Sequence, residues 1–184
     1  ILGPDLTNLR NVLDITSDEE YYYTLARSSS TYSAATRICK WDRDDGAMVG
    51  SCSTGASYGT AISIYEDEDE LFVLQTQTSS TYRKIVGFSS STLASNGKSL
   101  SYGSGLSAYT FTQDIDVDEN TGDLYVVYRD FNGRIRGYDR DVSGDYCASS
   151  ACYTQVYTGA RYGISIEAHN DYVYVMGYYY SSYY

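Results

Sequence analysis

The stretch Ile115-Asp116-Val117-Asp118-Glu119-Asn120-Thr121-Gly122-Asp123-Leu124-Tyr125-Val126 decides the fold class, because it places a polar turn between two short apolar segments. Short apolar runs on either side of an Asn-Thr-Gly turn are typical of a β-hairpin. The same order occurs three more times: Leu13-Asp14-Ile15 with Tyr21-Tyr22-Tyr23, Ile62-Ser63-Ile64 with Leu71-Phe72-Val73, and Ile164-Ser165-Ile166 with Val173-Tyr174-Val175. The sequence therefore predicts four copies of one hairpin.

A further strand follows each of the first three hairpins, with an isoleucine three residues before an aromatic residue. The three segments are Arg37-Ile38-Cys39-Lys40-Trp41-Asp42, Lys84-Ile85-Val86-Gly87-Phe88-Ser89 and Arg134-Ile135-Arg136-Gly137-Tyr138-Asp139. With Ile15, Ile64, Val117 and Ile166 taken as equivalent anchors, the copies lie about 50 residues apart, a period typical of propeller blades. We expect these anchors and the third-strand isoleucines to be buried between repeats, because one repeat cannot cover its own faces.

These repeats predict an all-β, propeller-like array of about four repeats of antiparallel strands. The chain is interpreted as one domain, 1–184, with repeats at about 13–54, 55–106 and 107–159 and an incomplete fourth at 160–184. Fourth, outer strands are expected at Ala47-Met48-Val49, Ser99-Leu100-Ser101 and 153–157. The incomplete repeat leaves two interpretations open. Either residues 1–6 close a small ring, or the chain is part of a larger propeller.

Two short motifs carry a resemblance to known propellers. The segment Arg37-Ile38-Cys39-Lys40-Trp41-Asp42 resembles the third strand of a WD40-type blade, which ends in Trp-Asp. Residues 118–126 resemble the hairpin of NHL- and YVTN-type propellers. The chain lacks the Gly-His pair of WD40 proteins and has no Trp-Asp after the first repeat. The resemblance implies a propeller-like fold and carries no activity with it.

The charge of the chain limits its partners. The 184 residues include 24 acidic and 13 basic side chains, for a net charge of −11. Nucleic acid and anionic membrane surfaces both require a basic footprint, so we expect neither as a partner. No apolar run is long enough to span a bilayer, and membrane insertion is not expected.

The four cysteines indicate the compartment. Cys39, Cys52, Cys147 and Cys152 show no Cys-x-x-Cys spacing, and His169 is the only histidine, so a zinc site is not favoured. We expect two local disulfides, Cys39–Cys52 and Cys147–Cys152, and hence a secreted, extracellular protein. The alternative is four free, buried thiols in a cytosolic protein.

The acidic turns are the main candidates for chemistry. Asp116, Asp118, Asn120 and Asp123 present oxygen atoms near a glycine, as calcium loops do, but the spacing departs from an EF-hand and favours a solvated turn. We therefore expect no cofactor, with Ca²⁺ as the alternative. His169 lies in a polar turn and the chain has no Gly-x-Ser-x-Gly motif, so we predict no catalytic residues and no enzyme.

Tyrosine enrichment suggests an interaction surface. The chain has 23 Tyr and only 4 Phe, and aromatic residues of this kind are enriched at protein interfaces. The predicted interaction residues are Tyr22, Tyr125, Tyr174, Tyr178, Tyr179, Tyr180, Tyr183 and Tyr184. The sequence predicts a non-catalytic secreted scaffold that binds other protein chains, above all copies of itself. The alternatives are a lectin-like binder of glycans and a fragment of a propeller enzyme.

Overall fold

The computed structural model describes residues 11–27, 35–76, 84–101, 111–129, 134–140, 153–157, 162–170 and 172–178. In these ranges the strands form three antiparallel 4-stranded sheets and one 2-stranded sheet. The strands of each sheet follow chain order, so each pairs with the next. The predicted all-β, propeller-like array is confirmed. Across the same ranges, none of the chain forms a helix long and apolar enough to cross a membrane.

Sheets 1 to 4 are numbered in chain order. Sheet 1 contains β1 (Asn11–Ser17), β2 (Tyr21–Arg27), β3 (Ala35–Asp42) and β4 (Ser53–Ser57). Sheet 2 contains β5 (Gly59–Tyr65), β6 (Glu70–Gln75), β7 (Lys84–Ser89) and β8 (Ser95–Ser101), with a 3-10 turn at Glu66–Glu68. Sheet 3 contains β9 (Phe111–Val117), β10 (Leu124–Arg129), β11 (Arg134–Tyr138) and β12 (Tyr153–Tyr157). Sheet 4 contains β13 (Tyr162–His169) and β14 (Tyr172–Tyr178).

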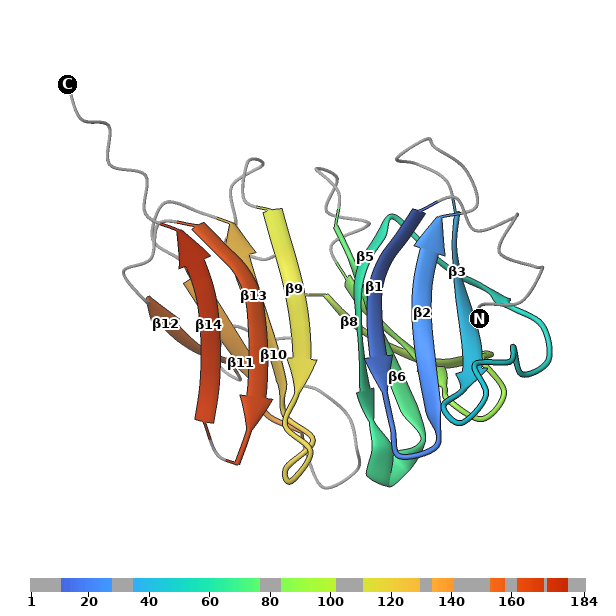
Figure 1. Ribbon diagram of the computed structural model, residues 1–184. Helices are drawn as coiled ribbons and strands as arrows, with labels where there is room; N and C mark the ends of the chain where they lie inside the picture. Colours follow the sequence, from blue (N-terminus) through green and yellow to red (C-terminus); the bar gives the residue numbers. More distant parts are fainter. Residues whose placement is uncertain are drawn as a thin grey trace.

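The first strands of the four sheets line the inner side of the array. Contacts join β1 to β5, β5 to β9 and β9 to β13, and Figure 1 shows the sheets fanning out from these strands. The sheets stack face to face, so sheets 2 and 3 each have one face toward the preceding sheet and one toward the following sheet. This is the arrangement of blades in a β-propeller.

Apolar side chains fill the space between successive sheets. Leu25 and Ile38 of sheet 1 belong to one buried cluster with sheet 2, whose contributions include Ile62, Leu71 and Phe88. Phe72 and Ile85 of sheet 2 belong to a second cluster, to which sheet 3 contributes Ile115, Leu124 and Tyr138. The core therefore lies between sheets, as the repeat pattern requires.

A β-bulge at the same place in each first strand aligns the four sheets. The pairing with the second strand skips one residue each time, and these residues are Leu13, Thr60, Gln113 and Ile164. On this alignment Ile15, Ile62, Ile115 and Ile166 are equivalent. The predicted anchors Ile64 and Val117 are therefore two residues too late. Since a shift of two residues leaves a side chain on the same face of a strand, apolar alternation alone does not detect it.

Most of the predicted core is confirmed, with two corrections. Ile38, Ile85, Ile64, Val117 and Ile166 are buried. The prediction was wrong for Ile15, which is 57% exposed, and for Ile135, which is only partly buried. The equivalents of Ile15 contact a preceding sheet, and no sheet precedes β1 in the described residues. The equivalents of Ile135 belong to clusters that include a third-strand aromatic residue of the following sheet, and only the first two strands of sheet 4 are described.

The fourth strand of sheet 1 lies later than predicted. It is β4 (Ser53–Ser57), whereas Met48 forms only an isolated bridge with Trp41. Gly46 and Gly50 both have φ of +70°, so the chain turns twice before β4 begins. In the other two sheets, β8 (Ser95–Ser101) and β12 (Tyr153–Tyr157) lie where the outer strands were expected.

One of the two predicted disulfides is present in the structure. Cys39 and Cys52 are bonded, with Cα atoms 4.3 Å apart. The bond connects β3 to the segment just before β4 and holds the outer edge of sheet 1 together. Cys147 and Cys152 lie outside the described residues.

Candidate interaction surface

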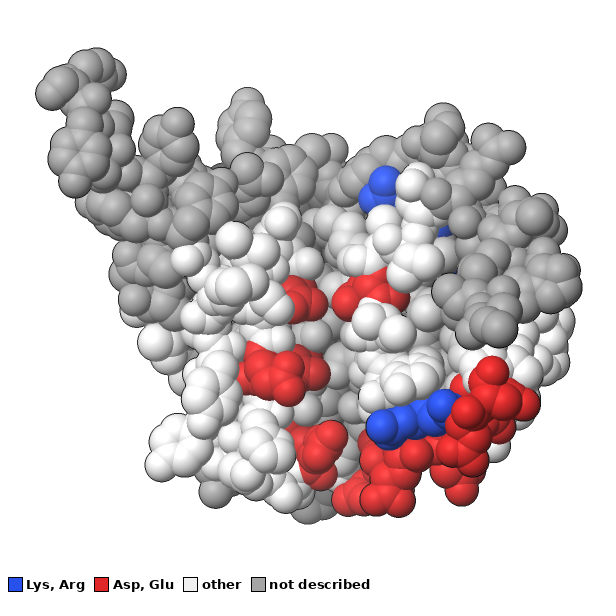
Figure 2. All heavy atoms as spheres, in the orientation of Figure 1, with Lys and Arg blue, Asp and Glu red and all other residues white. Residues whose placement is uncertain are grey.

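Among the described residues, the most exposed large apolar side chains lie on sheet 4. Tyr172, Tyr174 and Met176 are 67%, 59% and 60% exposed and follow one another on one face of β14. The β14 sequence, Tyr-Val-Tyr-Val-Met-Gly-Tyr, contains no charged residue, and in Figure 2 the surface over this strand is free of Lys, Arg, Asp and Glu. We call Tyr172, Tyr174 and Met176 the β14 face. Exposed apolar surface of this kind marks interaction sites in soluble proteins.

The three predicted interaction tyrosines with described side chains do not form one surface. Tyr174 lies on the β14 face, whereas Tyr22 is exposed on sheet 1, at the opposite end of the array (Figure 1). Tyr125 is partly buried in β10, between sheets 3 and 4. Tyr178 is the last residue of β14, and Tyr179, Tyr180, Tyr183 and Tyr184 lie outside the described residues.

An apolar groove of about 440 Å³ lies on the other side of β14, between sheets 3 and 4. Its lining residues are Tyr125, Ile135, Gly137, Thr154, Val156, Val173 and Val175. Ile135 lies opposite Val156 in the third sheet, as Ile85 lies opposite Leu100 in the second. Val156 is 53% exposed, whereas Leu100 is 3% exposed.

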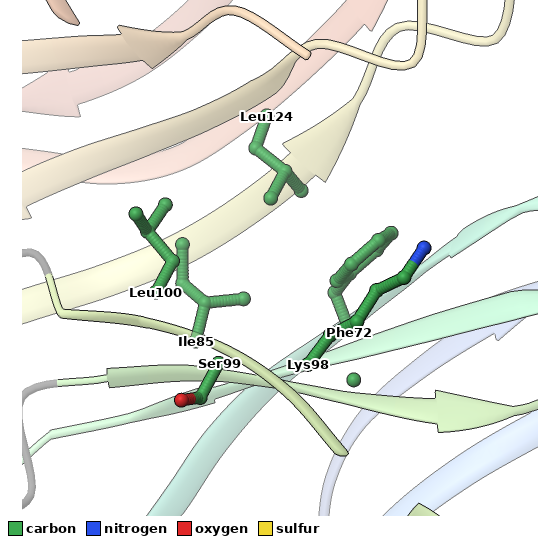
Figure 3. A pocket seen from close by; sticks show the side chains of 7 residues that line it. Phe72, Ile85, Lys98, Ser99, Leu100 and Leu124 are labelled. Carbon is green, nitrogen blue, oxygen red and sulfur yellow. The ribbon is translucent and has the colours of Figure 1, made fainter. Parts of the chain in front are cut away.

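The corresponding place between sheets 2 and 3 is nearly filled. Only a cavity of about 120 Å³ remains there, and Figure 3 shows Leu124 approaching Phe72, Ile85 and Leu100 from the neighbouring sheet. The larger groove is therefore a sheet-to-sheet interface that the two described strands of sheet 4 cover only in part.

A polar groove of about 360 Å³ runs along the inner ends of the sheets, and aspartates there join neighbouring first strands. Asp14 Oδ2 accepts a hydrogen bond from the Ile62 amide at 2.8 Å. In the same way, Asp114 Oδ2 accepts one from the Ile166 amide at 3.1 Å. Asp116 accepts hydrogen bonds from the Ser63 hydroxyl and the Ala168 amide, each at 2.7 Å. Figure 2 shows acidic side chains gathered at the centre of this face.

Burial changes the acidity of two of these aspartates. It raises the pKa of Asp14 to about 6, and the nearby charges of Asp114 and Asp116 act in the same direction. The hydrogen bond from the Ile62 amide opposes this shift. Burial likewise raises the pKa of Asp116 to about 6, against the hydrogen bonds from Ala168 and Ser63. These carboxylates are partly desolvated structural acceptors.

In the acidic turn considered for Ca²⁺, two of the aspartate side chains accept hydrogen bonds from backbone amides. Asp118 Oδ1 accepts hydrogen bonds from the amides of Asn120 (2.8 Å) and Thr121 (3.4 Å). Asp123 Oδ1 accepts one from the Arg140 amide at 2.9 Å, and Asp116 is bonded toward the neighbouring sheets. Within the described ranges, no three His, Cys, Asp or Glu side chains are grouped as metal ligands. The absence of a cofactor stays a prediction.

A second polar joint, which the sequence pattern did not indicate, connects the turn between β5 and β6 of sheet 2 to the residues after β11 of sheet 3. Arg140 forms an ion pair with Glu68 and lies 3.6 Å from a carboxylate oxygen of Glu70. Lys98 Nζ lies 2.5 Å from Glu70, and the Arg140 guanidinium lies 4.9 Å from the centre of the Tyr65 ring. The hydrogen bond from Arg140 lowers the pKa of Glu68. Part of the acidic run after β5 therefore connects two sheets.

Comparisons with known proteins support the fold. A hydrazine synthase from Kuenenia stuttgartiensis has a TM-score of 0.59 and 11% identity, over 90% of this chain and 40% of its own. The WD40 repeats of RRP9 have a TM-score of 0.56 and 11% identity, over 88% of this chain and 44% of that one. The structure of U3-55K has a TM-score of 0.56 and 11% identity, over 91% of this chain and 47% of that one. The chain thus spans less than half of each of these structures.

These similarities show that the chain has a β-propeller-like fold that matches part of larger propellers. At 11% identity they concern the fold alone. No protein-family model matches the chain, and no curated protein matches it.

Sequence reasoning missed Tyr172 and Met176 as surface residues. The β14 segment Tyr-Val-Tyr-Val-Met has apolar or aromatic residues on both faces of the strand, so the alternation of apolar and polar residues does not indicate which face is exposed. The absence of a third-strand motif after β14 was the available signal.

Proposed function

We propose that this chain is a non-catalytic, secreted β-propeller scaffold that takes part in extracellular assembly by binding other protein chains. The observation that carries the proposal is the exposure of Tyr174 and Met176 on the uncharged β14 face. Tyr and Met are enriched at protein interfaces. The Cys39–Cys52 bond supports an oxidising compartment.

The arrangement of polar residues supports a non-catalytic role. His169 is exposed at the end of β13, and the inner aspartates accept hydrogen bonds from backbone amides and serine hydroxyls. These bonds join neighbouring first strands, so we interpret the groove carboxylates as structural acceptors.

A lectin-like function is the second candidate. The rings of Tyr172 and Tyr174 lie 6.4 Å apart at 43° on the exposed face. Exposed tyrosine rings can stack on the apolar face of a sugar as well as on a protein.

The test replaces the β14 face. A Tyr174→Ser, Met176→Ser double variant is compared with wild type and with Val49→Ser, which replaces an exposed apolar residue near the rim of sheet 1. Native mass spectrometry is expected to detect assemblies of wild type and Val49→Ser but only monomers of the double variant, with no binding on a glycan array. The lectin-like function would be favoured if wild type stays monomeric and binds glycans, and if the double variant loses that binding. If wild type neither assembles nor binds another protein, the proposal is overturned.

A further inference from the structure

Two residues of the β14 face, Tyr174 and Met176, are equivalent to residues that are mostly buried in the other three sheets. The residues following the four bulges pair with Leu25, Leu74, Val127 and Met176. Leu25, Leu74 and Val127 are fully buried and Met176 is not. Two residues earlier, Tyr174 is equivalent to Tyr23 and Phe72, which are also buried, and to Tyr125, which is partly buried beside the open groove. Tyr23 and Phe72 pack against the following sheet, so the β14 face has the composition of a surface that receives another sheet.

The opposite end of the array exposes the other half of the same interface. Ile15 is equivalent to Ile62 and Ile115, which pack against the preceding sheet and are buried. Tyr22 is equivalent to Leu71 and Leu124, which pack in the same direction. Ile15 and Tyr22, which we call the β1–β2 face, are both exposed. One molecule therefore carries both surfaces of a contact that it already makes internally.

The polar joints repeat with a period of two sheets. The residue after the bulge is an aspartate in sheets 1 and 3, and each binds the next amide of its own strand, at 2.9 Å for Ile15 and 3.0 Å for Ile115. In sheets 2 and 4 the same position holds Ala61 and Ser165, and the next amide is bound by the aspartate of the preceding sheet. A junction of sheet 4 with sheet 1 of another copy would therefore have the same pattern as the junction of sheet 2 with sheet 3. In both junctions, the amide of the isoleucine after the aspartate is bound by the aspartate of its own strand.

A hydroxyl and a carboxylate would also meet at that junction. Between sheets 2 and 3, the Ser63 hydroxyl donates to Asp116. The equivalent residues are Glu167 in sheet 4 and Thr16 in sheet 1, by their positions in the strand register. The donor and acceptor exchange sides, and the pair remains complementary.

We propose that the β14 face binds the β1–β2 face of a second copy of this chain, head to tail, and that two copies close an eight-sheet ring. The proposal rests on the proposed function and names the partner. Surfaces related head to tail form rings when the rotation closes. Two copies also approach the length of the similar propeller chains, of which one copy covers 40%, 44% and 47%.

Two complementary variants test the arrangement. Met176→Asp disables the β14 face, and Ile15→Asp disables the β1–β2 face; both residues are exposed, so each variant keeps its core. Val49→Asp is the matched control. Sedimentation equilibrium is expected to give wild type and control a mass of twice 20.5 kDa, and each variant alone the mass of one chain. The dissociation constant of each variant should rise by about ten-fold or more.

The mixture of the two variants distinguishes head-to-tail from face-to-face contact. Met176→Asp retains the β1–β2 face and Ile15→Asp retains the β14 face, so an equimolar mixture should form a mixed dimer through one intact contact. Face-to-face pairing would leave one variant fully dimeric alone and would overturn the inference. Assembly that survives in both variants would also overturn it, while the proposed function would stand. A monomeric wild type, whether bound to another protein or covered by further sheets of its own polypeptide, would overturn the head-to-tail dimer.

Discussion

Ile85 and Ile135 occupy the same place in successive repeats, and the structure predicts that truncating them has very different effects. Both residues belong to third strands, opposite Leu74 and Val127 respectively. Ile85 is 1% exposed and lies in the cluster between sheets 2 and 3, whereas Ile135 lines the open groove beside β14. The pair therefore compares one substitution in a closed and in an open copy of the same interface.

The expected cost follows from burial and the adjacent space. Removing a fully buried isoleucine side chain down to alanine costs about 2–5 kcal/mol, and more where the site does not collapse around the cavity. Ile85 already borders a cavity of about 120 Å³ together with Phe72 and Leu100, so Ile85→Ala enlarges an existing void. We expect a loss of about 3–4 kcal/mol for Ile85→Ala. Ile135→Ala loses less apolar burial and opens no closed cavity, so we expect about 1 kcal/mol.

Equilibrium unfolding in urea measures both losses. The free energy of unfolding is taken from the midpoint and the slope, under non-oxidising and non-reducing conditions that preserve the disulfide. The protein concentration is kept low enough that wild type is monomeric, because association of folded chains would add to the free energy of unfolding. Equal losses for the two variants, or a loss below about 0.5 kcal/mol for Ile85→Ala, would refute the assignment of the closed and open interfaces.

Three further predictions follow from the polar joints and turns. Because the folded-state pKa of Asp14 is about 6, above its usual 3.8, the folded state binds more protons between these values, and this group's contribution to stability falls as pH rises through that window. Asp14→Asn should therefore gain up to about 3 kcal/mol relative to wild type between pH 4 and pH 7 in urea unfolding, and a pH-independent difference would contradict the raised pKa. Gly122→Ala should cost about 1–3 kcal/mol more than Gly46→Ala in the same assay. Both have positive φ, but a Cβ on Gly122 would lie 2.8 Å from Arg140 Cδ, whereas nothing lies within 4 Å at Gly46; equal costs would count against this packing. Chelators should leave the melting temperature unchanged. A calcium-dependent rise that disappears in Asp116→Asn, Asp118→Asn would show that the acidic turn binds the ion.

The third-strand motif was the most informative part of the sequence. An isoleucine followed three residues later by an aromatic residue places two apolar side chains on opposite faces of one strand. In the structure, Ile85 packs toward sheet 3 and Phe88 toward sheet 1. Such a strand needs a sheet on both sides, and this requirement predicts a stacked array. The Cys39–Cys52 bond could also be anticipated, because it closes a local turn within one repeat.

The sequence was less informative about register and about the inner groove. Apolar alternation has a period of two, so Ile62 and Ile64 are equally good anchors by pattern, and only the bulge at Thr60 separates them. The hydrogen bonds from the Ile62 amide to Asp14 and from the Ser63 hydroxyl to Asp116 join residues about 50 positions apart. Aspartates within a strand carry no local sign of such partners, so the inner groove was not predicted.

The sequence by itself determined that the chain forms repeated β-hairpins whose faces must be covered by one another. That conclusion depends only on local alternation, on turn residues and on a constant period, all of which are properties of neighbouring positions in the chain. The tertiary structure alone decided which copies of a repeated residue are buried. Ile15 and Ile62 have the same place in their strands, yet among the described residues a sheet packs against Ile62 and not against Ile15, because burial depends on the neighbour and not on the residue. For the same reason Met176, the counterpart of the buried Leu25 and Leu74, lies exposed at the end of the array.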